Sequence, residues 1–421
     1  MSGGKGKASG PKMKPLVWQK VPKNRLKGTV WQDIKDAAEQ AEPSFDAAKF
    51  EALFTIKAAP EKPTLSRSAS SSGATSTKLL DPKRAMNLSI NLAKLRLPVE
   101  QIRKAVIDLD VAVLSHENVD ALQKCVPTPE EVELVMASAD ATSLGYAEQF
   151  VLSLGTVPRL KARLDCFAYK HTFNQQLHAL YADAGALTTA AKQLVSCAPL
   201  KQLLGMLLHL GNALNAGSFR SGAEGFKLEC LPRLLELKAN EGALSLLHFA
   251  LTSVHESAFE SADAALKSPI PSLAEHVPAV RGAAKLSTTE LLEEAARLEQ
   301  GLKLVASEIG QFRADTAKGA PNEGDAAACD RFVAAEKFLL MMDPFYEGCK
   351  GQVEELGRAT AEMSEAQGKM KVYFSEDSKA SIDEVYSRWA SFLGQVETAV
   401  AHINDDRKRA EAKQARNSKA A

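Results

Sequence analysis

The stretch GNALNAGSFRSGAEGF, from Gly211 to Phe226, carries the residues whose types and spacing are hardest to explain as a plain helical core. Asn212 and Asn215 follow a leucine-rich run, and buried amides without hydrogen-bond partners cost a few kcal/mol. The glycines beside them give the backbone freedom to approach another segment closely. The pattern therefore predicts a docking surface rather than a catalytic pocket.

The common catalytic and phosphate-binding motifs are absent from the sequence. It contains no H-E-x-x-H, no G-x-S-x-G and no G-x-x-x-x-G-K-[ST], and the loop Gly217 to Gly225 lacks the Lys-Ser/Thr pair that holds phosphate and metal. The eight His lack ligand spacing, and His209 in its leucine-rich run is interpreted as a core residue. The six Cys form no C-x-x-C pair, which predicts neither a zinc site nor a disulfide framework. We expect no enzymatic activity, no cofactor and no metal.

Composition favours an all-α fold. The chain of 421 residues is 45% hydrophobic, 25% charged and only 6% aromatic, with a net charge of zero. Helix-forming residues dominate most windows, and clusters of β-branched residues are short. The most apolar window, Leu203 to Leu214, is too short and too polar to span a bilayer, so no membrane insertion is expected. The cysteine usage fits a reducing cytosol.

The N-terminal arm is strongly basic and carries two tryptophans. Residues 1–27 contain eight Lys or Arg and no acid, a charge of +8. Such an arm can engage nucleic acid, anionic lipid or an acidic protein surface, and residues 1–12 can equally be a solvated tail. Prolines and a glycine between Trp18 and Trp31 discourage a helix there. The two indoles either insert into another surface or fold back on the same chain.

A flexible linker separates this arm from the rest of the chain. Residues 44–57 predict a short helix, with Ser44 as its N-cap. In residues 64–77, nine of fourteen are Ser or Thr, so residues 58–79 are interpreted as a linker. Its length corresponds to about 26 Å as a coil and up to about 75 Å when extended, enough to reach a neighbouring subunit.

Helical patterns fill most of the remainder. Asp81 and Pro82 predict a helix start, and residues 226–251 are also predicted to be helical, with a break near 240–242. Apolar residues spaced by three and four predict a long helix over 291–312, which we expect to pair with a second one over 326–371.

Several stretches, in order, resemble signatures of one family: KMKPLVWQKVP, LDPKRAMNLSINLAKLR, PTPEEVELV, LGYAEQFVLSLGTVPRLKARLDCF, GNALNAG, GAEGFKLECLPRL and VYFSED. The family is the formin homology 2 domain, the actin-assembly domain of formins, and the resemblance covers roughly residues 13–401. It implies an all-α, elongated helical domain that forms a head-to-tail, ring-like dimer. The implied parts are a lasso and first helix (13–57), the linker (58–79), knob and coiled-coil helices (80–200) and a post (201–401), between a disordered basic segment (1–12) and a charged tail (402–421).

The resemblance assigns the dimer contacts. Trp18 and Trp31 match the lasso tryptophans, and Gly211, Asn212 and Asn215 match the G-N-x-x-N motif of the post. The arm of one copy is then expected to occupy the post of a second copy, so that two heterologous interfaces close a ring. The tryptophans of the arm would then find an apolar surface on the post, and the asparagines of the post would find hydrogen-bond partners in the arm.

The resemblance also implies actin contacts, because the ring is thought to embrace the filament barbed end, nucleate filaments and stay attached. Ile90 and Lys238 match the family's best-known actin-binding residues. From the residues alone, Ile90 is as readily a core residue and Lys238 a solvated lysine. Lys14, Lys83 and Arg84 would add attraction to actin's acidic surface.

Two departures from the family pattern stand out. Ala213 replaces an aromatic found in many relatives, which is expected to loosen the post. Formins usually place a proline-rich, profilin-binding segment before this domain, but residues 1–12 hold a single Pro. Either the chain is a fragment or it works without profilin delivery. The alternative function is a helical scaffold that binds microtubules or other partners through its basic arm, without actin nucleation. No nucleic-acid partner is implied, and the expected location is the cytoplasm and cytoskeleton.

Overall fold

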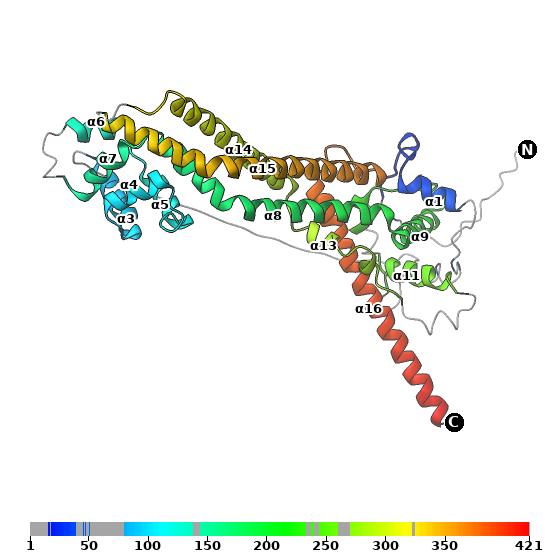
Figure 1. The fold of residues 1–421 in the computed structure, drawn as a ribbon. Helices are drawn as coiled ribbons and strands as arrows, with labels where there is room; N and C mark the ends of the chain where they lie inside the picture. Colours follow the sequence, from blue (N-terminus) through cyan, green and yellow to red (C-terminus); the bar gives the residue numbers. More distant parts are fainter. Residues whose placement is uncertain are drawn as a thin grey trace, which may run out of the picture. The chain divides into compact units, whose positions relative to one another are not determined.

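The computed structural model describes residues 16, 18–38, 45, 47, 50, 80–137, 144–232, 237–239, 244–259, 270–321 and 325–420. Within these residues there are thirteen α-helices and three short 3-10 helices, and the only extended pairings are two isolated bridges (Figure 1). The all-α prediction is confirmed. The predicted linker, all but three residues of the predicted helix over 44–57, and Lys14 lie outside the described residues.

The α-helices are α1 (Val30–Ala38), α3 (Pro82–Leu95), α4 (Val99–Asp108), α5 (His116–Cys125), α6 (Pro129–Ala137), α7 (Tyr146–Gly155), α8 (Leu160–Ser196), α9 (Ala198–Leu214), α11 (Leu246–Glu256), α13 (Val280–Ala283), α14 (Thr288–Thr316), α15 (Ala326–Tyr373) and α16 (Ile382–Ala420). The 3-10 helices are η1 (Lys23–Arg25), η2 (Leu228–Cys230) and η3 (Leu273–His276).

The chain divides into two compact units. Unit 1 comprises Met1–Thr64, Asp183–Leu291 and Thr360–Ala421, and unit 2 comprises Leu65–Ala182 and Leu292–Ala359. Both units are discontinuous in sequence, and α8, α14 and α15 contribute residues to each. The domain boundaries drawn along the sequence stay a prediction.

Unit 2 is built on one apolar core. Helix α3 begins where the sequence predicts, because the Asp81 carboxylate accepts hydrogen bonds from the backbone N–H groups of Lys83 and Arg84. Its leucines Leu88 and Leu92 are fully buried. They join a cluster with side chains of α4, α5, α7, α8, α14 and α15. Burial of this apolar surface is the main term that stabilises the unit.

A buried arginine crosses this core. The guanidinium of Arg163 lies over the rings of Phe312 and Phe338, 5.3 and 5.4 Å from their centroids. It donates hydrogen bonds to the carbonyls of Ile107 (3.1 Å) and Ala334. Burial lowers the pKa of Arg163 to about 10. The charge is therefore balanced by carbonyl dipoles and aromatic faces, which ties α8 to α4, α14 and α15 within unit 2.

The long-helix prediction is confirmed in α14 and α15. Of the seven α14 positions in the predicted apolar stripe, six are buried and one is half-buried. Phe312 of α14 packs on Phe338 of α15, with ring centroids 4.4 Å apart.

The predicted helix over residues 226–251 is wrong for residues 237–239, 244 and 245. In the described part of this stretch, η2, residues 231–232 and α11 from Leu246 are helical, and the predicted break at residues 240–242 lies outside the described residues. Lys238 instead forms an antiparallel bridge with Ser245, and hydrogen bonds join the backbones of Leu237 to Leu246 and Ala239 to Leu244. The leucines of this stretch fit a helical spacing, and Leu228 and Leu231 are buried, so the pattern alone does not reveal the extended pairing.

Unit 1 gathers its core around α9 and α16. Ten of the seventeen residues of α9 are buried. Within α16, Tyr386 donates a hydrogen bond to the carbonyl of Leu187 (2.8 Å), and Trp389 packs on Phe374 with centroids 4.7 Å apart. This unit positions the docking surface that the sequence predicts.

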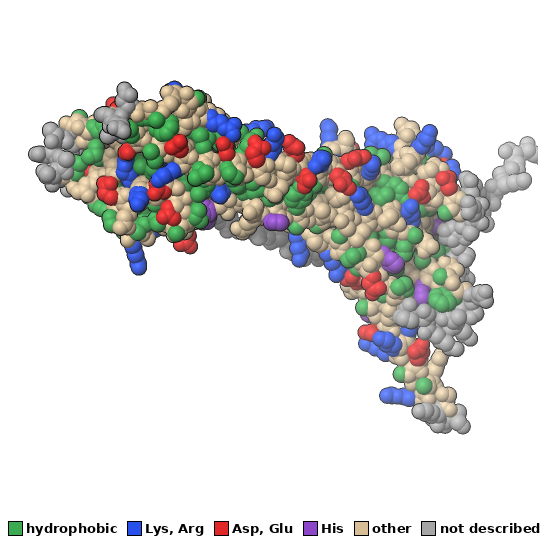
Figure 2. Space-filling model, in the orientation of Figure 1, with side chains coloured by type: hydrophobic (Ala, Val, Ile, Leu, Met, Phe, Trp, Pro, Cys, Tyr) green, Lys and Arg blue, Asp and Glu red, His purple; other side chains and the backbone are tan. Residues whose placement is uncertain are grey.

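The exposed charges are mixed in sign. Figure 2 shows basic and acidic side chains interspersed over the visible face, with apolar side chains between them. In the described part of the chain, no single helix is both long and apolar enough to cross a membrane, whereas α8 and α9, bent where they meet, meet that test only as a pair.

Candidate functional site

The candidate site is a surface of unit 1 formed by α9 and the loop that follows it. From here on, the word post is used in a narrower sense than the region 201–401 implied by the resemblance, for residues 198–232 alone, and the word arm is used for residues 16–38. Asn212 closes the loop back onto the helix: its side-chain N–H donates to the carbonyl of Ala223, and its carbonyl accepts from the N–H of Ala223, both at 2.8 Å. The first of the two awkward amides is thus satisfied within the post.

Asn215 satisfies its amide with the arm. Its side-chain oxygen accepts from the backbone N–H of Leu16, and its side-chain nitrogen donates to the carbonyl of Leu16, both at 3.0 Å. Asn215 is 2% exposed. These two buried hydrogen bonds hold Leu16 at the start of the described arm. If either bond were lost, a buried polar group of Leu16 or Asn215 would remain without a partner, which carries a desolvation penalty.

The missing side chain of Gly211 makes room for the first tryptophan. A Cβ at this position would clash with the ring of Trp18 and lie 2.7 Å from a methyl of Leu16. Trp18 also stacks on Phe226, with ring centroids 5.8 Å apart and ring planes inclined by 13°. The glycine of the G-N-x-x-N motif therefore acts here by permitting close approach.

Trp31 packs against the same phenylalanine and against a second glycine. A Cβ at Gly225 would lie 2.6 Å from the Trp31 ring, and the rings of Trp31 and Phe226 are 4.5 Å apart. Both tryptophans are buried. Phe226 consequently contacts both indoles, a packing that removes a large apolar area from water.

Between the tryptophans the arm pairs with the post through its backbone. The N–H of Val21 donates to the carbonyl of Gly225, and the N–H of Lys227 donates to the carbonyl of Gln19, both at 3.1 Å. Lys20 and Phe226 form the corresponding antiparallel bridge. These contacts fix the register of the arm.

The helical end of the arm is held by a polar cluster. Asp33 of α1 accepts hydrogen bonds from Tyr373 (2.7 Å) and Lys201 (2.9 Å). The Tyr373 hydroxyl, with Lys201, lowers the pKa of Asp33 despite its desolvation. Sequence reasoning missed this cluster and Leu16, because neither stands out by residue type or spacing.

The structure brings together all five predicted dimer residues, Trp18, Trp31, Gly211, Asn212 and Asn215. The expectation placed the arm on the post of a second copy, whereas in this single chain the arm docks on its own post. The assignment of these residues to a dimer interface stays a prediction. Ala213 is half-buried beside these contacts.

The predicted actin-binding residues fall into different environments. Ile90 is 49% exposed and Met86, one turn earlier on α3, is 64% exposed. The interpretation of Ile90 as a core residue is therefore wrong. Lys83 is exposed on the same helix, and Lys238 is exposed on its extended bridge in unit 1.

Arg84 has a structural role within unit 2. Its guanidinium forms an ion pair with Glu131 at 2.7 Å and donates to the carbonyls of Lys124 (3.0 Å) and Val126 (2.8 Å). The hydrogen bond to Glu131 raises the pKa of Arg84. These contacts join α3 to α5 and α6, and they explain the arginine without an external partner.

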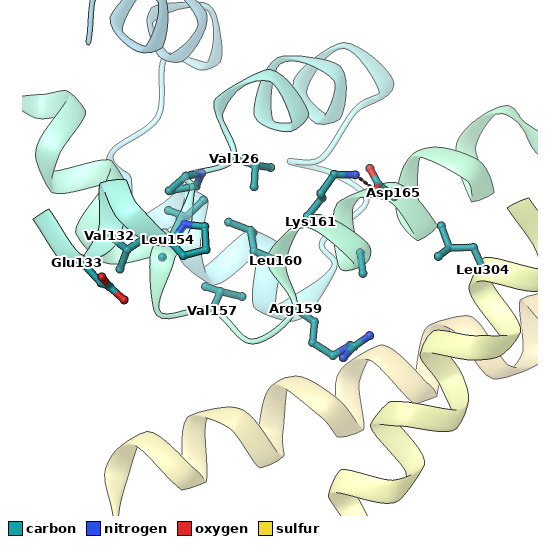
Figure 3. Close-up of a pocket in the computed structure, with 14 residues that line it drawn as sticks. Val126, Val132, Glu133, Leu154, Val157, Arg159, Leu160, Lys161, Asp165 and Leu304 are labelled. Carbon is teal, nitrogen blue, oxygen red and sulfur yellow. Dashed lines mark hydrogen bonds and ion pairs between the residues drawn. The ribbon is translucent and has the colours of Figure 1, made fainter. Parts of the chain in front are cut away.

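Unit 2 also has an open, mostly apolar groove of about 670 Å3 (Figure 3). Four charged side chains lie at it: Glu133, Arg159, Lys161 and Asp165. Lys161 pairs with Asp165 at 2.7 Å, and Arg159 makes a bidentate pair with Glu308 at 2.5 and 2.6 Å. Ion pairs of this kind leave the groove an apolar packing surface rather than an acid–base site.

Comparison with known proteins identifies the family of the chain. The family described as Formin Homology 2 Domain matches residues 4–397. Formin-like protein 14 of Arabidopsis thaliana is 31% identical over 405 residues, covering 95% of this chain and 31% of the relative. Formin-like protein 12 of Oryza sativa subsp. japonica is 30% identical over 412 residues (95% and 23%), and Formin-H of Dictyostelium discoideum is 27% identical over 391 residues (92% and 33%). The chain spans between about a quarter and a third of the length of these relatives.

Proposed function

The chain belongs to the formin family through its Formin Homology 2 domain, which implies a non-enzymatic role in actin assembly, and we propose that it nucleates actin filaments and remains bound at their barbed ends as a ring-like homodimer. The observation that carries this proposal is the docking of the arm on the post. The same contacts made between two chains would create two heterologous interfaces that close a ring.

Exchange of the arm between chains needs no new chemistry. Asn215 would form the same hydrogen bonds with the backbone of Leu16, and Gly211 would leave the same space for Trp18, whichever chain supplied the arm. Because the contacts are identical, the choice between one chain and two depends on the connection between arm and knob and on protein concentration. The sequence predicts a linker long enough to reach a second copy.

The proposed actin surface includes the exposed face of α3 in unit 2 and Lys238 in unit 1. An exposed isoleucine beside an exposed methionine is suited to burial against a partner. Lys83 on α3 and Lys238 would add attraction to an acidic surface. Arg84 is left out of this set because its donors already bind Glu131 and two carbonyls.

The alternative function, a scaffold that binds through its basic arm, has less support. Lys20 donates to two carbonyls of the post, and Lys23 pairs with Glu224 at 3.0 Å. Two lysines of the arm are thus used in docking it. Microtubule cosedimentation that is abolished by deleting residues 1–12 would favour the scaffold.

An actin assembly assay with the Ile90→Ala variant tests the proposal. Low nanomolar wild-type protein is expected to accelerate filament formation, and Ile90→Ala is expected to lose at least tenfold of this activity, because it removes a surface anchor without disturbing the core. Ala93→Ser, a change on the same exposed face of α3, is the matched control. Wild-type protein that neither nucleates actin nor changes elongation would refute the proposal, and loss of the thermal transition in Ile90→Ala would refute its surface role.

A further inference from the structure

The later turns of α16 extend beyond the apolar core of unit 1. The apolar side chains that α16 buries recur as far as Ile403, which is 8% exposed. From residue 405 to residue 418 every side chain is exposed except that of Arg407, which is half-buried. Figure 1 shows this part of α16 running past α11 and α13 of the same unit. These turns are therefore helical without burying an apolar face against the described residues.

The charge of these turns is one-sided. Residues 407–418, which we call the basic helix, contain a single acid, Glu411, and have a net charge of +4. Two acids, Asp405 and Asp406, come directly before it. The five cations are Arg407, Lys408, Arg409, Lys413 and Arg416. The only apolar side chains of the basic helix are alanines.

Exposed helical turns elsewhere in the chain balance their charges. A helix that is polar on all sides depends on ion pairs between residues three or four positions apart. In α14, Lys303 pairs with Glu299 at 2.6 Å, and in α15, Lys369 pairs with Glu365 at 2.7 Å. These helices are thus built to stand in water on their exposed sides.

The basic helix lacks such pairs. Arg409 reaches Asp406 at 3.5 Å, whereas Lys408, Lys413 and Arg416 form no ion pair with any residue that the structure describes. Like charges at positions 409, 413 and 416 repel one another along one side of the helix. The helix macrodipole favours cations within the last turn only, and these three lie before it. An external anion would relieve this repulsion.

The cations share one face of the helix. At 3.6 residues per turn, four of them fall within an arc of about 140° and about 12 Å of helix length: Lys408, Arg409, Lys413 and Arg416. Glu411 lies outside this arc. No side chain is available to anchor a protein interface or to insert among acyl chains. The arrangement fits a flat surface of dense negative charge better than a nucleic-acid groove, whose phosphates flank a helix on both sides.

We propose that the basic helix binds the surface of a membrane that contains anionic lipid, without inserting into the bilayer. Lys408, Lys413 and Arg416 lie against the headgroups, and unit 1 is thereby held at the membrane. Each lysine or arginine near such a surface strengthens binding about fivefold, so the contact is reversible and salt-dependent. This surface is separate from the arm, the post and α3, and the inference does not rest on the proposed function.

Vesicle cosedimentation of the full chain tests the inference. Wild-type protein is expected to bind vesicles of phosphatidylcholine and phosphatidylserine mixed at about 7:3, and not vesicles of phosphatidylcholine alone. The triple variant Lys408→Gln, Lys413→Gln, Arg416→Gln keeps good helix formers and removes three unpaired cations. It is expected to need about a hundredfold more lipid for half-maximal binding. Lys408→Arg with Lys413→Arg keeps the charge and is expected to bind as wild type does.

Two matched controls each remove three cations from elsewhere. The variant Lys303→Gln, Arg358→Gln, Lys369→Gln neutralises three ion-paired cations of α14 and α15. Deletion of residues 1–12 removes three lysines before the arm. Both proteins are expected to bind the mixed vesicles within about threefold of wild type.

Several results would overturn the inference. Wild-type protein that does not bind the mixed vesicles does so, and so does a triple variant of the basic helix that binds them as wild type does. A larger loss on deleting residues 1–12 would assign lipid binding to that segment instead. A short RNA duplex that binds wild-type protein but not the triple variant, with no binding to vesicles, would make the partner a nucleic acid.

Discussion

At the scale of single residues, the two asparagines of the post have different hydrogen-bond partners. Asn212 binds its own loop, and Asn215 binds the backbone of the arm. The sequence predicts that both amides need partners, because of their apolar surroundings. It does not distinguish the local partner from the distant one, since the partner atoms are main-chain atoms of Ala223 and Leu16 that no residue type marks.

Asn215→Asp should release the arm. A carboxylate still accepts from the N–H of Leu16, but it cannot donate to the carbonyl of Leu16, and it places a charge at a buried position. The expected loss of docking free energy is about 2 kcal/mol or more. Amide hydrogen exchange at Val21, whose N–H bonds to Gly225, should then accelerate about thirtyfold. Asn174→Asp adds the same charge at an exposed site of α8 and should leave this amide unchanged. Equal protection of Val21 in wild type and Asn215→Asp would contradict the role of Asn215.

At the scale of elements, α9 is a helix whose glycines serve its partner rather than itself. Gly205 faces Ile34 of α1, and Gly211 faces Trp18 and Leu16. Glycine in a helix interior is unfavourable by about 1 kcal/mol relative to alanine. These glycines lower the intrinsic stability of α9, but they leave room for the side chains of the arm.

Gly211→Ala should therefore stabilise α9 and weaken the docking of the arm. The substitution favours α9 but drives a Cβ into the Trp18 ring, so the arm should leave the post. Tryptophan fluorescence should shift to the red as Trp18 meets water. The control is Gly205→Ala, whose Cβ would lie 3.3 Å from a methyl of Ile34, a contact that a small shift relieves. A blue, wild-type-like emission spectrum for Gly211→Ala would show that the pocket is wider than these contacts indicate.

The start of α11 carries a pH-dependent cap. The Ser245 N–H donates to Nδ1 of His248 at 3.3 Å, an acceptor role that only the neutral ring can fill. Burial lowers the pKa of His248, and the neighbouring His402 lowers it further, while Asp406 opposes both. The folded state therefore favours neutral His248, and its contribution to stability is complete above the ordinary value of 6.5 and is lost as the pH falls below it.

His248→Gln should remove this dependence and keep the cap, because Ser-x-x-Gln is also a capping box. Urea titrations give the free energy of unfolding of each protein at pH 7.5 and at pH 5.5. The decrease in this free energy from pH 7.5 to pH 5.5 should be smaller for the variant than for wild type. The remaining loss would come from other titratable groups. If both proteins lose the same free energy, His248 does not contribute to the acid sensitivity.

At the scale of the whole molecule, the spacing of apolar residues predicted where helices lie better than it predicted which residues contact one another. The apolar stripe of α14 and the start of α3 at Asp81 and Pro82 follow from local rules that the structure obeys. The extended pairing at Lys238 was missed because its leucines also fit a helical period. The ion pair between Arg84 and Glu131 was missed because a sequence shows charges without showing their partners.

The pairing of arm and post was predictable for a different reason. Two tryptophans without a core and two amides without partners are each unfavourable alone, so each implies a complement elsewhere. That logic identifies the two surfaces, but it does not decide which chain supplies each one, since identical contacts form within one chain or between two.

The Trp18→Ala, Trp31→Ala double variant tests the assembly. Wild-type protein is expected to be a dimer by light scattering, and the double variant a monomer, because the two indoles are the largest buried apolar side chains of the docked arm. Tyr146→Ala, a change at an exposed aromatic residue of unit 2, should stay dimeric. Wild-type protein that is monomeric across micromolar concentrations would show that the arm stays on its own post, and a dimeric double variant would show that other surfaces hold the two copies together.

The post reads the arm largely through main-chain atoms. Asn215 holds both polar groups of one peptide residue, and the ladder beside Gly225 likewise binds N–H and C=O groups. Main-chain groups are the same for almost every side chain, so the arm can vary in sequence at exposed positions such as Gln19. Selectivity among related chains then depends on the buried and ion-paired side chains of the arm and on two glycines of the post that leave no room for a side chain, Gly211 and Gly225. A paralogue that keeps both glycines and these side chains of the arm would be able to exchange subunits with this one, and a single added methyl group at either glycine would isolate it.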